Sequence, residues 1–124
     1  MADRAIVLFA HGARDPAWAE PFKRIKCLLQ ARQPGIAVEL AFLEIMQPSL
    51  ADAIATLARA GHASIAIAPL FMAQGGHLKN DLPKILDEIR ARHHGVELKL
   101  LPAVGDVEPV LDAIAGWLVG AMAR

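Results

Sequence analysis

The chain has 124 residues, 13 basic and 13 acidic side chains and a hydrophobic fraction of 55%, so we expect one folded domain over residues 1–124 rather than a disordered segment. Because neither half of the chain has more than one charge in excess, it lacks the basic surface that nonspecific nucleic-acid binding requires. Its longest apolar runs, residues 63–73 and 113–123, are shorter than the roughly 20 residues of a membrane span, so we expect a soluble protein with neither a nucleic-acid nor a membrane partner.

The first half of the chain alternates between predicted strands and helices. Residues 6–10 are a continuous apolar run that ends at His11 and Gly12, which is typical of a strand buried on both faces. Asp15 and Pro16 predict the start of a helix whose apolar positions 18, 22, 25 and 29 share one face. Residues 36–43 predict a second strand, and apolar positions 50, 54 and 57 predict a second helix that ends at Gly61.

The second half continues this alternation. Residues 64–70 and 96–101 predict two further strands, with a helix between them that has apolar positions 85, 86 and 89. A last helix has apolar positions 110, 114 and 118, and we expect Asp106 to cap it. Strands that alternate with crossover helices predict an α/β fold, a three-layer sandwich with a four-stranded parallel sheet and helices on both faces.

Two histidines and a carboxylate follow three different predicted strands. His11 comes after the first strand, Glu44 after the second, and His77 after the third. Ligands of open parallel sheets bind beyond the carboxyl ends of the strands, and imidazole with carboxylate suits a divalent ion such as cobalt, nickel, iron or zinc. We therefore predict a shared site at this edge. The alternative is that His11 only caps a turn and Glu44 only solvates a loop.

Residues 73–83 predict a flexible loop that runs into the start of the third helix. Gly75 and Gly76 allow a ligand to approach the backbone closely. We expect Asn80 or Asp81 to cap the helix that contains Pro83; the alternative for Asp81 is a hydrogen bond that orients His77. Nucleotide binding is weakly supported, because neither of the two glycine-rich phosphate-binding signatures occurs in the chain.

Cysteine usage and the amino terminus bear on the compartment. Cys27 is the single cysteine and has no partner for an intramolecular disulfide. Residues 1–10 lack an apolar region long enough for a signal peptide. We expect a cytoplasmic protein.

A set of short motifs carries a resemblance to a known family. The motifs are Ala-His-Gly-Ala-Arg at 10–14, Phe-Leu-Glu at 42–44, Pro-Ser-Leu at 48–50, Pro-Leu-Phe at 69–71, Gly-Gly-His at 75–77 and Asp-Leu-Pro at 81–83. In this combination and order, over nearly the whole chain, the sequence resembles the short, CbiX-type sirohydrochlorin chelatases. These are similar to class II tetrapyrrole chelatases, which insert a divalent metal into a macrocycle without ATP. Longer members have two α/β halves, and the short ones pair as homodimers.

The resemblance implies roles for particular residues. His11 and His77 match the metal-handling, catalytic histidines, and Glu44 matches the family's acidic residue near the site. Ala13 departs from the pattern, because many relatives have serine there. Imidazole has a reference pKa of about 6.5 and can accept a proton near neutral pH, and Glu44 is a candidate to receive or relay protons from the pyrrole nitrogens.

The substrate implied by the resemblance carries eight carboxylates. Arg14 and Lys79 flank the two histidines and are candidates to bind this acidic rim; the alternative is that they are ordinary solvated charges. Gly12, Gly75 and Gly76 are further candidates for substrate contact. Phe71, with Leu70, is either an apolar wall against the macrocycle or a core residue at a strand end.

The resemblance implies a lyase that inserts cobalt, or as second choice iron or nickel, into sirohydrochlorin in cobalamin or siroheme synthesis. A non-catalytic metal carrier or tetrapyrrole-binding protein with the same site is the alternative. A histidine phosphatase has an Arg-His-Gly motif after its first strand, but position 10 here is Ala. The phosphate clamp of that class is therefore incomplete.

Overall fold

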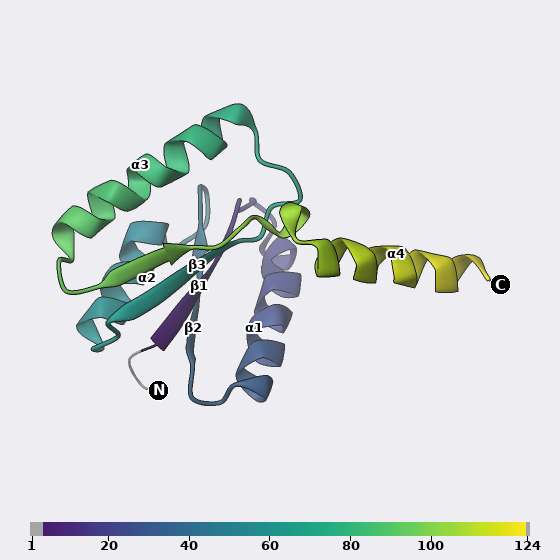
Figure 1. Ribbon diagram of the computed structural model, residues 1–124, viewed down its shortest axis with the longest axis horizontal. Coiled ribbons are helices and arrows are strands. Elements are labelled where there is room, and N and C mark those ends of the chain that lie inside the picture. Colours follow the sequence, from purple (N-terminus) through teal and green to yellow (C-terminus); the bar gives the residue numbers. More distant parts are fainter. Residues whose placement is uncertain (1–3, 124) are drawn as a thin grey trace.

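Four parallel strands form a single sheet (Figure 1). The computed structural model describes residues 4–123, apart from the side chain of His77. The spatial order is β2-β1-β3-β4, and the ends of each strand lie within two residues of the predicted ones. The strands are β1 (Arg4–Ala10), β2 (Ala37–Phe42), β3 (Ser64–Pro69) and β4 (Glu97–Leu100). The predicted parallel α/β fold is confirmed.

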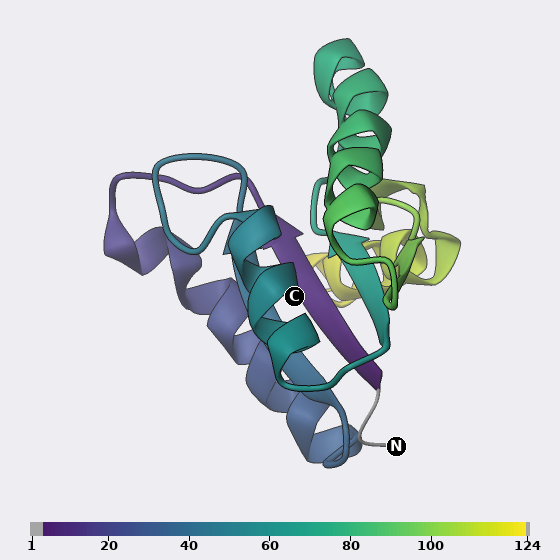
Figure 2. The same ribbon diagram turned by 90° about the vertical axis from the view of Figure 1, so that its left-hand side faces the viewer.

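The helices lie on both faces of this sheet. The connection from β1 to β2 runs one way along the sheet, and the connections that lead to β3 and β4 run the other way. Right-handed crossovers therefore put the first helix on one face and the next two on the other, as Figures 1 and 2 show. The helical elements in chain order are η1 (Pro16–Ala19), α1 (Glu20–Arg32), α2 (Leu50–Arg59), α3 (Gly76–Arg92), η2 (Val104–Asp106) and α4 (Glu108–Met122).

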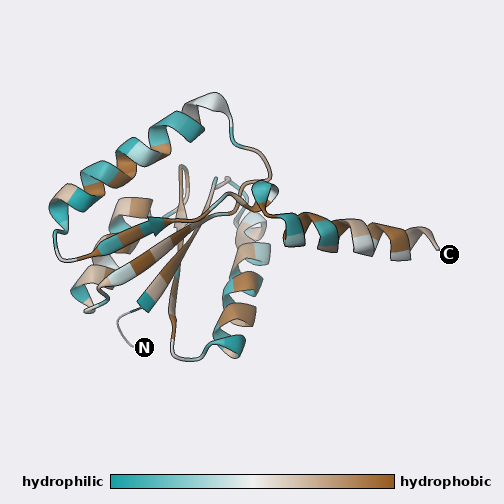
Figure 3. Cartoon of the chain, in the orientation of Figure 1, coloured by the Kyte–Doolittle hydropathy of each residue, from teal (hydrophilic) through white to brown (hydrophobic). Residues whose placement is uncertain are grey.

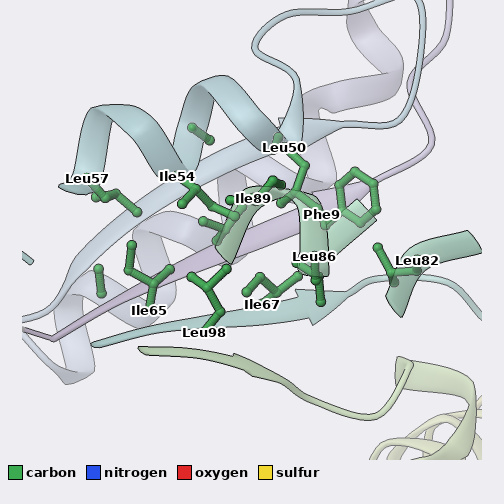
Figure 4. Packing of buried hydrophobic residues seen from close by; sticks show 14 of the residues in the cluster. Phe9, Leu50, Ile54, Leu57, Ile65, Ile67, Leu82, Leu86, Ile89 and Leu98 are labelled. Carbon is green, nitrogen blue, oxygen red and sulfur yellow. The ribbon is translucent and has the colours of Figure 1, made fainter. Parts of the chain in front are cut away.

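The main core fills the layer between the sheet and the helices α2 and α3 (Figure 4). Alternate strand residues point into this layer, and Val7, Ile65 and Ile67 are fully buried there. Apolar residues spaced three and four apart on α2 and α3 meet them. The helix contribution includes Leu50, Ile54, Leu57, Leu82, Leu86 and Ile89. Each such side chain stabilises the fold by roughly 1.5–3 kcal/mol when fully buried.

A smaller cluster joins α1 to the other face of the sheet. Ala10, Ala19 and Phe42 are buried there, with Trp18 and Phe22 packed against them. The predicted start of this helical segment is confirmed, because an Asp15 carboxylate oxygen accepts a hydrogen bond of 2.9 Å from the backbone N–H of Ala17. A short 3₁₀ turn, η1, precedes the α-helix proper.

The start of α3 differs from the sequence prediction. The helix begins at Gly76, with Gly75 as the residue before its first turn. Asn80 and Asp81 therefore lie inside the helix and do not cap it, and Pro83 is an interior residue. The reason is that the apolar stripe starts earlier than positions 85, 86 and 89, since Leu78 is half-buried and Leu82 is fully buried.

The last helix also departs from the prediction. Asp106 is the final residue of η2 and does not cap α4, whose preceding residue is Val107. The helix α4 projects away from the domain and does not cover the sheet (Figure 1), although it is rich in apolar residues (Figure 3). Within residues 4–123, no helix combines the length and the apolar character needed to cross a membrane.

Candidate metal-handling site

The loops after β1 and β2 run side by side at the carboxyl edge of the sheet. The backbone N–H of Leu43 donates to the carbonyl of Ala10 at 2.9 Å, and that of Glu44 donates to the carbonyl of His11 at 3.0 Å. The parallel pairing of the two strands thus continues one residue pair beyond the sheet. It holds the backbones of His11 and Glu44 together, and both residues are exposed to solvent.

Gly12 is required by the close approach of these two loops. Its φ of +97° lies in the left-handed region, and a Cβ atom at this position would lie 2.0 Å from the carbonyl oxygen of Glu44. A side chain would therefore be strained by its backbone angle and would clash with a backbone atom. Gly12 acts at this site by letting the loop that carries His11 lie against the loop that carries Glu44.

An aromatic ring from the end of β3 packs against His11. The N–H of Leu70 donates to the carbonyl of Phe9 at 2.8 Å, which fixes the start of the third loop beside β1. The next residue, Phe71, is 2% exposed, and its ring centroid lies 4.4 Å from that of His11 at an interplanar angle of 51°. Phe9 meets the same ring edge to face at 5.6 Å. Phe71 is thus a core residue that also contacts the candidate histidine.

The loop after β4 packs against the backbone of Phe71 and Met72. The N–H of Gly105 donates to the carbonyl of Phe71 at 3.1 Å, and a Cβ on Gly105 would lie 1.5 Å from the carbonyl oxygen of Met72. Only glycine fits at this contact. The backbone of residues 71 and 72 is therefore held between η2 on one side and the end of β1 on the other.

The third group of candidate residues lies at the start of α3. Gly75 precedes the helix, His77 is in its first turn, and the N–H of Lys79 donates to the carbonyl of Gly75 at 3.0 Å. The roles predicted for the His77 side chain fall outside the described part of the structure. Among the side chains that are described, no group of three or more His, Cys, Asp or Glu residues is arranged to hold a metal ion. A joint site of His11, Glu44 and His77 thus stays a prediction.

The two candidate cations and Asp81 are all exposed. Arg14 lies in the loop after His11, and Lys79 and Asp81 lie in the first two turns of α3. The ion pairs found among the described residues join Lys23 to Glu20, Lys26 to Glu39 and Arg90 to Asp87. Arg14 and Lys79 take part in none of them.

Three exposed apolar side chains at this edge were missed by the sequence analysis. Leu43 is 37% exposed, and Ile45 and Met72 are each 61% exposed. Leu43 and Ile45 flank Glu44, and Met72 follows Phe71. Ile45 also has a φ of 69°, an outlying value for a β-branched residue. The signal that was available in the sequence is the occurrence of large apolar residues directly after two strands, on either side of polar site residues.

Comparison with known proteins identifies the family. The CbiX family model matches residues 5–118. A sirohydrochlorin cobaltochelatase of Sulfurisphaera tokodaii is 32% identical over 109 residues, which cover 88% of this chain and 86% of the relative. A sirohydrochlorin cobaltochelatase of Methanopyrus kandleri is 33% identical over 82 residues, 66% of this chain and 57% of the relative.

Solved structures agree with this result. A CbiX protein from Marinobacter aquaeolei VT8 superposes with a TM-score of 0.83 at 28% identity, over 98% of both chains. The sirohydrochlorin chelatase SirB of Bacillus subtilis subspecies spizizenii, solved with cobalt, has the same fold with a TM-score of 0.79 at 21% identity. The match covers 95% of this chain and 50% of SirB, so this chain corresponds to one half of that molecule. The chain belongs to the CbiX family.

Proposed function

We propose that this protein inserts a divalent metal ion into sirohydrochlorin without ATP, with cobalt as its first metal and iron or nickel as the second. Cobaltochelatases of the same family, 32% and 33% identical to this chain, support the reaction and cobalt as the first metal. The product belongs to cobalamin or siroheme synthesis.

The observation that carries the proposal is the pairing of His11 with Glu44 at the carboxyl edge. The hydrogen bond from the Glu44 N–H to the His11 carbonyl brings a neutral nitrogen ligand and a carboxylate to adjacent positions on two loops. His11 remains exposed while its ring rests on Phe71. An exposed imidazole in this position is suited to bind an ion that arrives from solvent and to release it again, because it does not neutralise the charge of the ion.

The exposed apolar residues suit the faces of the macrocycle. Leu43 and Ile45 in the Glu44 loop and Met72 in the loop after β3 are exposed apolar side chains at this edge, and exposed apolar surface on a folded domain marks binding sites. Arg14 and Lys79 carry positive charges that no carboxylate among the described residues engages. Their guanidinium and ammonium groups suit the carboxylates at the rim of the substrate. Gly75 and Gly76, where a Cβ atom would meet nothing within 4 Å, leave the backbone open to close contact, whereas the same position at Gly12 is filled by the carbonyl oxygen of Glu44.

The proposed insertion exchanges bonds between the metal ion, its ligands and the macrocycle, and it needs no ATP. The metal ion loses its water ligands to His11 and His77 and then to the pyrrole nitrogens, and the macrocycle releases two N–H protons as four metal–nitrogen bonds form. Glu44 is the proposed first acceptor of these protons, which then pass to solvent. The metal–nitrogen bonds of the product provide the free energy, so ATP has no role.

We further propose that the protein acts in the cytoplasm as a homodimer. One chain corresponds to half of the two-domain SirB molecule by its coverage, and a single copy presents an open, exposed edge around His11 rather than an enclosed site. A second copy provides the missing enclosure of a large macrocycle.

Anaerobic mixing tests the reaction directly. Purified protein, sirohydrochlorin and one of Co²⁺, Fe²⁺ or Ni²⁺ are combined, and the absorption change of metal insertion is followed against the rate without protein. We expect acceleration, greatest with Co²⁺. Metal and tetrapyrrole binding without acceleration by any of the three ions would instead identify a carrier or binding protein.

A further inference from the structure

A small apolar pocket lies beside the candidate site, on the face of the sheet that α2 and α3 cover. Its volume is about 170 Å³, and an apolar cavity of this size has room for a small hydrocarbon group. The ends of β1 and β2, the first turn of α2 and one side of α3 form it, with Phe9, Leu43, Leu50, Ala51 and Ile85 among its lining residues. Figure 4 shows Phe9 and Leu50 together at the end of the sheet where α2 begins. We call this cavity the Ile85 pocket.

The Ile85 pocket is one aromatic ring away from His11. The ring of Phe9, which lines the pocket, lies 5.6 Å from that of Phe71, and Phe71 lies 4.4 Å from His11. Phe9 is 1% exposed and Phe71 is 2% exposed, so close packing of the core fixes both rings. A tetrapyrrole is several side chains wide. If its centre lies at His11, its edge can therefore reach the pocket.

The loop that carries Glu44 also borders the pocket. The N–H of Phe42 donates to the carbonyl of Pro48 at 2.9 Å, and Phe42 forms an isolated parallel bridge with Ser49. The two ends of the loop are therefore held together. Leu43 is the one lining residue that is exposed, so it lies at the open side of the pocket, and it directly precedes Glu44. The pocket and the proposed proton acceptor thus belong to the same short loop.

The Ile85 pocket offers no charged partner to a ligand. None of its lining residues has an ionisable side chain. Its one hydroxyl, that of Ser49, accepts a hydrogen bond of 3.2 Å from the N–H of Asp52 as the cap of α2. A carboxylate that entered the pocket would lose water without gaining a cation, which is unfavourable. A ligand group that occupies the pocket is therefore apolar.

The edge of the proposed substrate carries one kind of group that meets this requirement. Most of the ring substituents of sirohydrochlorin are arms that end in carboxylates, which need water or a cation. Its reduced pyrrole rings also carry methyl groups on saturated carbons, and these project from the ring plane and end in no charge. Uroporphyrin has the same number of carboxylate arms and no ring methyl group. The methyl groups thus distinguish the two macrocycles.

We propose that the Ile85 pocket binds a ring methyl group of sirohydrochlorin and so selects C-methylated tetrapyrroles over macrocycles that carry only carboxylate arms. The inference rests on the proposed function, because it takes sirohydrochlorin as the ligand. A methyl group held in the pocket also limits rotation of the macrocycle about its centre. The same pyrrole nitrogens then face His11 and Glu44 each time the substrate binds.

Ala51→Leu fills the pocket and tests the proposal by binding alone. Ala51 is half-buried in the first turn of α2 and lines the pocket, and leucine is a good helix former. Metal-free sirohydrochlorin and uroporphyrin are each titrated anaerobically into the protein, and tryptophan fluorescence is followed. We expect the Kd for sirohydrochlorin to rise about tenfold, as for other apolar pockets that distinguish one methyl-sized group. The Kd for uroporphyrin should stay unchanged.

Two further variants complete the test. Ala58→Leu makes the same change two turns further along the same face of α2, at a half-buried residue outside the pocket lining, and is expected to leave both Kd values unchanged. Ile85→Ala removes a wall of the pocket instead of filling it, and is expected to raise the Kd for sirohydrochlorin alone. Circular dichroism checks the fold of each variant, so the proposal stays testable if one of the substitutions disturbs folding.

The outcomes separate this proposal from the proposed function. An unchanged Kd for sirohydrochlorin in folded Ala51→Leu and Ile85→Ala, or an equal rise for both macrocycles, would overturn the methyl pocket while native protein that still inserts metal leaves the chelatase proposal in place. Native protein that neither binds sirohydrochlorin nor accelerates insertion would overturn the proposed function, and the pocket with it. A rise confined to sirohydrochlorin supports the pocket.

Discussion

Gly12 and Glu44 meet backbone to backbone at the carboxyl edge of the sheet, where a Cβ on Gly12 would lie 2.0 Å from the Glu44 carbonyl oxygen. The contact lies next to the hydrogen bond that joins Glu44 to His11. The spacing of the two candidate catalytic residues therefore depends on the absence of a side chain at position 12.

Gly12→Ala is expected to lower both stability and activity. The positive φ and the clash together cost at least about 2 kcal/mol in the free energy of unfolding, and the shift of the loop separates His11 from Glu44. Urea unfolding and the rate of metal insertion measure the two effects. Gly95→Ala is the matched control, since a Cβ at Gly95 meets nothing within 4 Å. Equal behaviour of the two variants would contradict this account of Gly12.

Phe71→Leu is expected to weaken metal handling through His11. The change removes the ring that lies 4.4 Å from the imidazole, and as a core substitution it costs about 1 kcal/mol of stability. Phe9→Leu alters the same aromatic cluster, in which Phe9 meets Phe71 edge to face, and serves as the control. We expect the apparent KM for Co²⁺ to rise further in Phe71→Leu than in Phe9→Leu. Parallel changes in both would assign Phe71 a structural role only.

Ile45→Asn is expected to weaken substrate binding without lowering the free energy of unfolding. Asparagine tolerates the left-handed region far better than a β-branched residue, so the free energy of unfolding should stay the same or rise by about 1 kcal/mol. The loss of an exposed apolar side chain beside Glu44 should raise the KM for sirohydrochlorin. A lower unfolding free energy with an unchanged KM would show that Ile45 is held for packing instead.

Arg14→Ala and Lys79→Ala are each expected to raise the KM for sirohydrochlorin by roughly two- to fivefold, the size of an exposed ion pair. The effect should shrink as salt is added, because exposed charges are screened. Arg59→Ala, an exposed cation at the end of α2 and the opposite edge of the sheet, provides the comparison. An equal effect at Arg59 would point to net charge rather than to a binding rim.

The sheet and the position of its loops can be predicted from the sequence, whereas the start of α3 cannot. The apolar run at 6–10 and the alternation of strands with helices after it predict a parallel sheet. Pro83 suggested a helix start near Asp81, but burial of Leu78 and Leu82 extends α3 back to Gly76. Tertiary packing outweighs a local signal for a later helix start there.

The direction of α4 and the positive φ of Ile45 could not be predicted from the spacing of apolar residues. The apolar spacing of α4 predicts a helix, yet the direction of its axis is set by Gly105, whose N–H bonds to a loop more than 30 residues earlier in the chain. Ile45 lies at the centre of a tight turn in which the N–H of Met46 donates to the carbonyl of Glu44 at 2.7 Å. The first feature depends on a contact between segments far apart in sequence and the second on a β-branched residue at positive φ, and periodicity encodes neither.

The rate of Co²⁺ insertion into sirohydrochlorin by the His11→Ala variant tests the central claim most directly. His94→Ala, an exposed histidine in the connection from α3 to β4, is the control, and circular dichroism checks that both variants keep the fold. We predict that His11→Ala falls to or near the spontaneous rate while His94→Ala retains the native rate, and that His77→Ala also slows insertion. Native rates in a folded His11→Ala variant would contradict the proposed site.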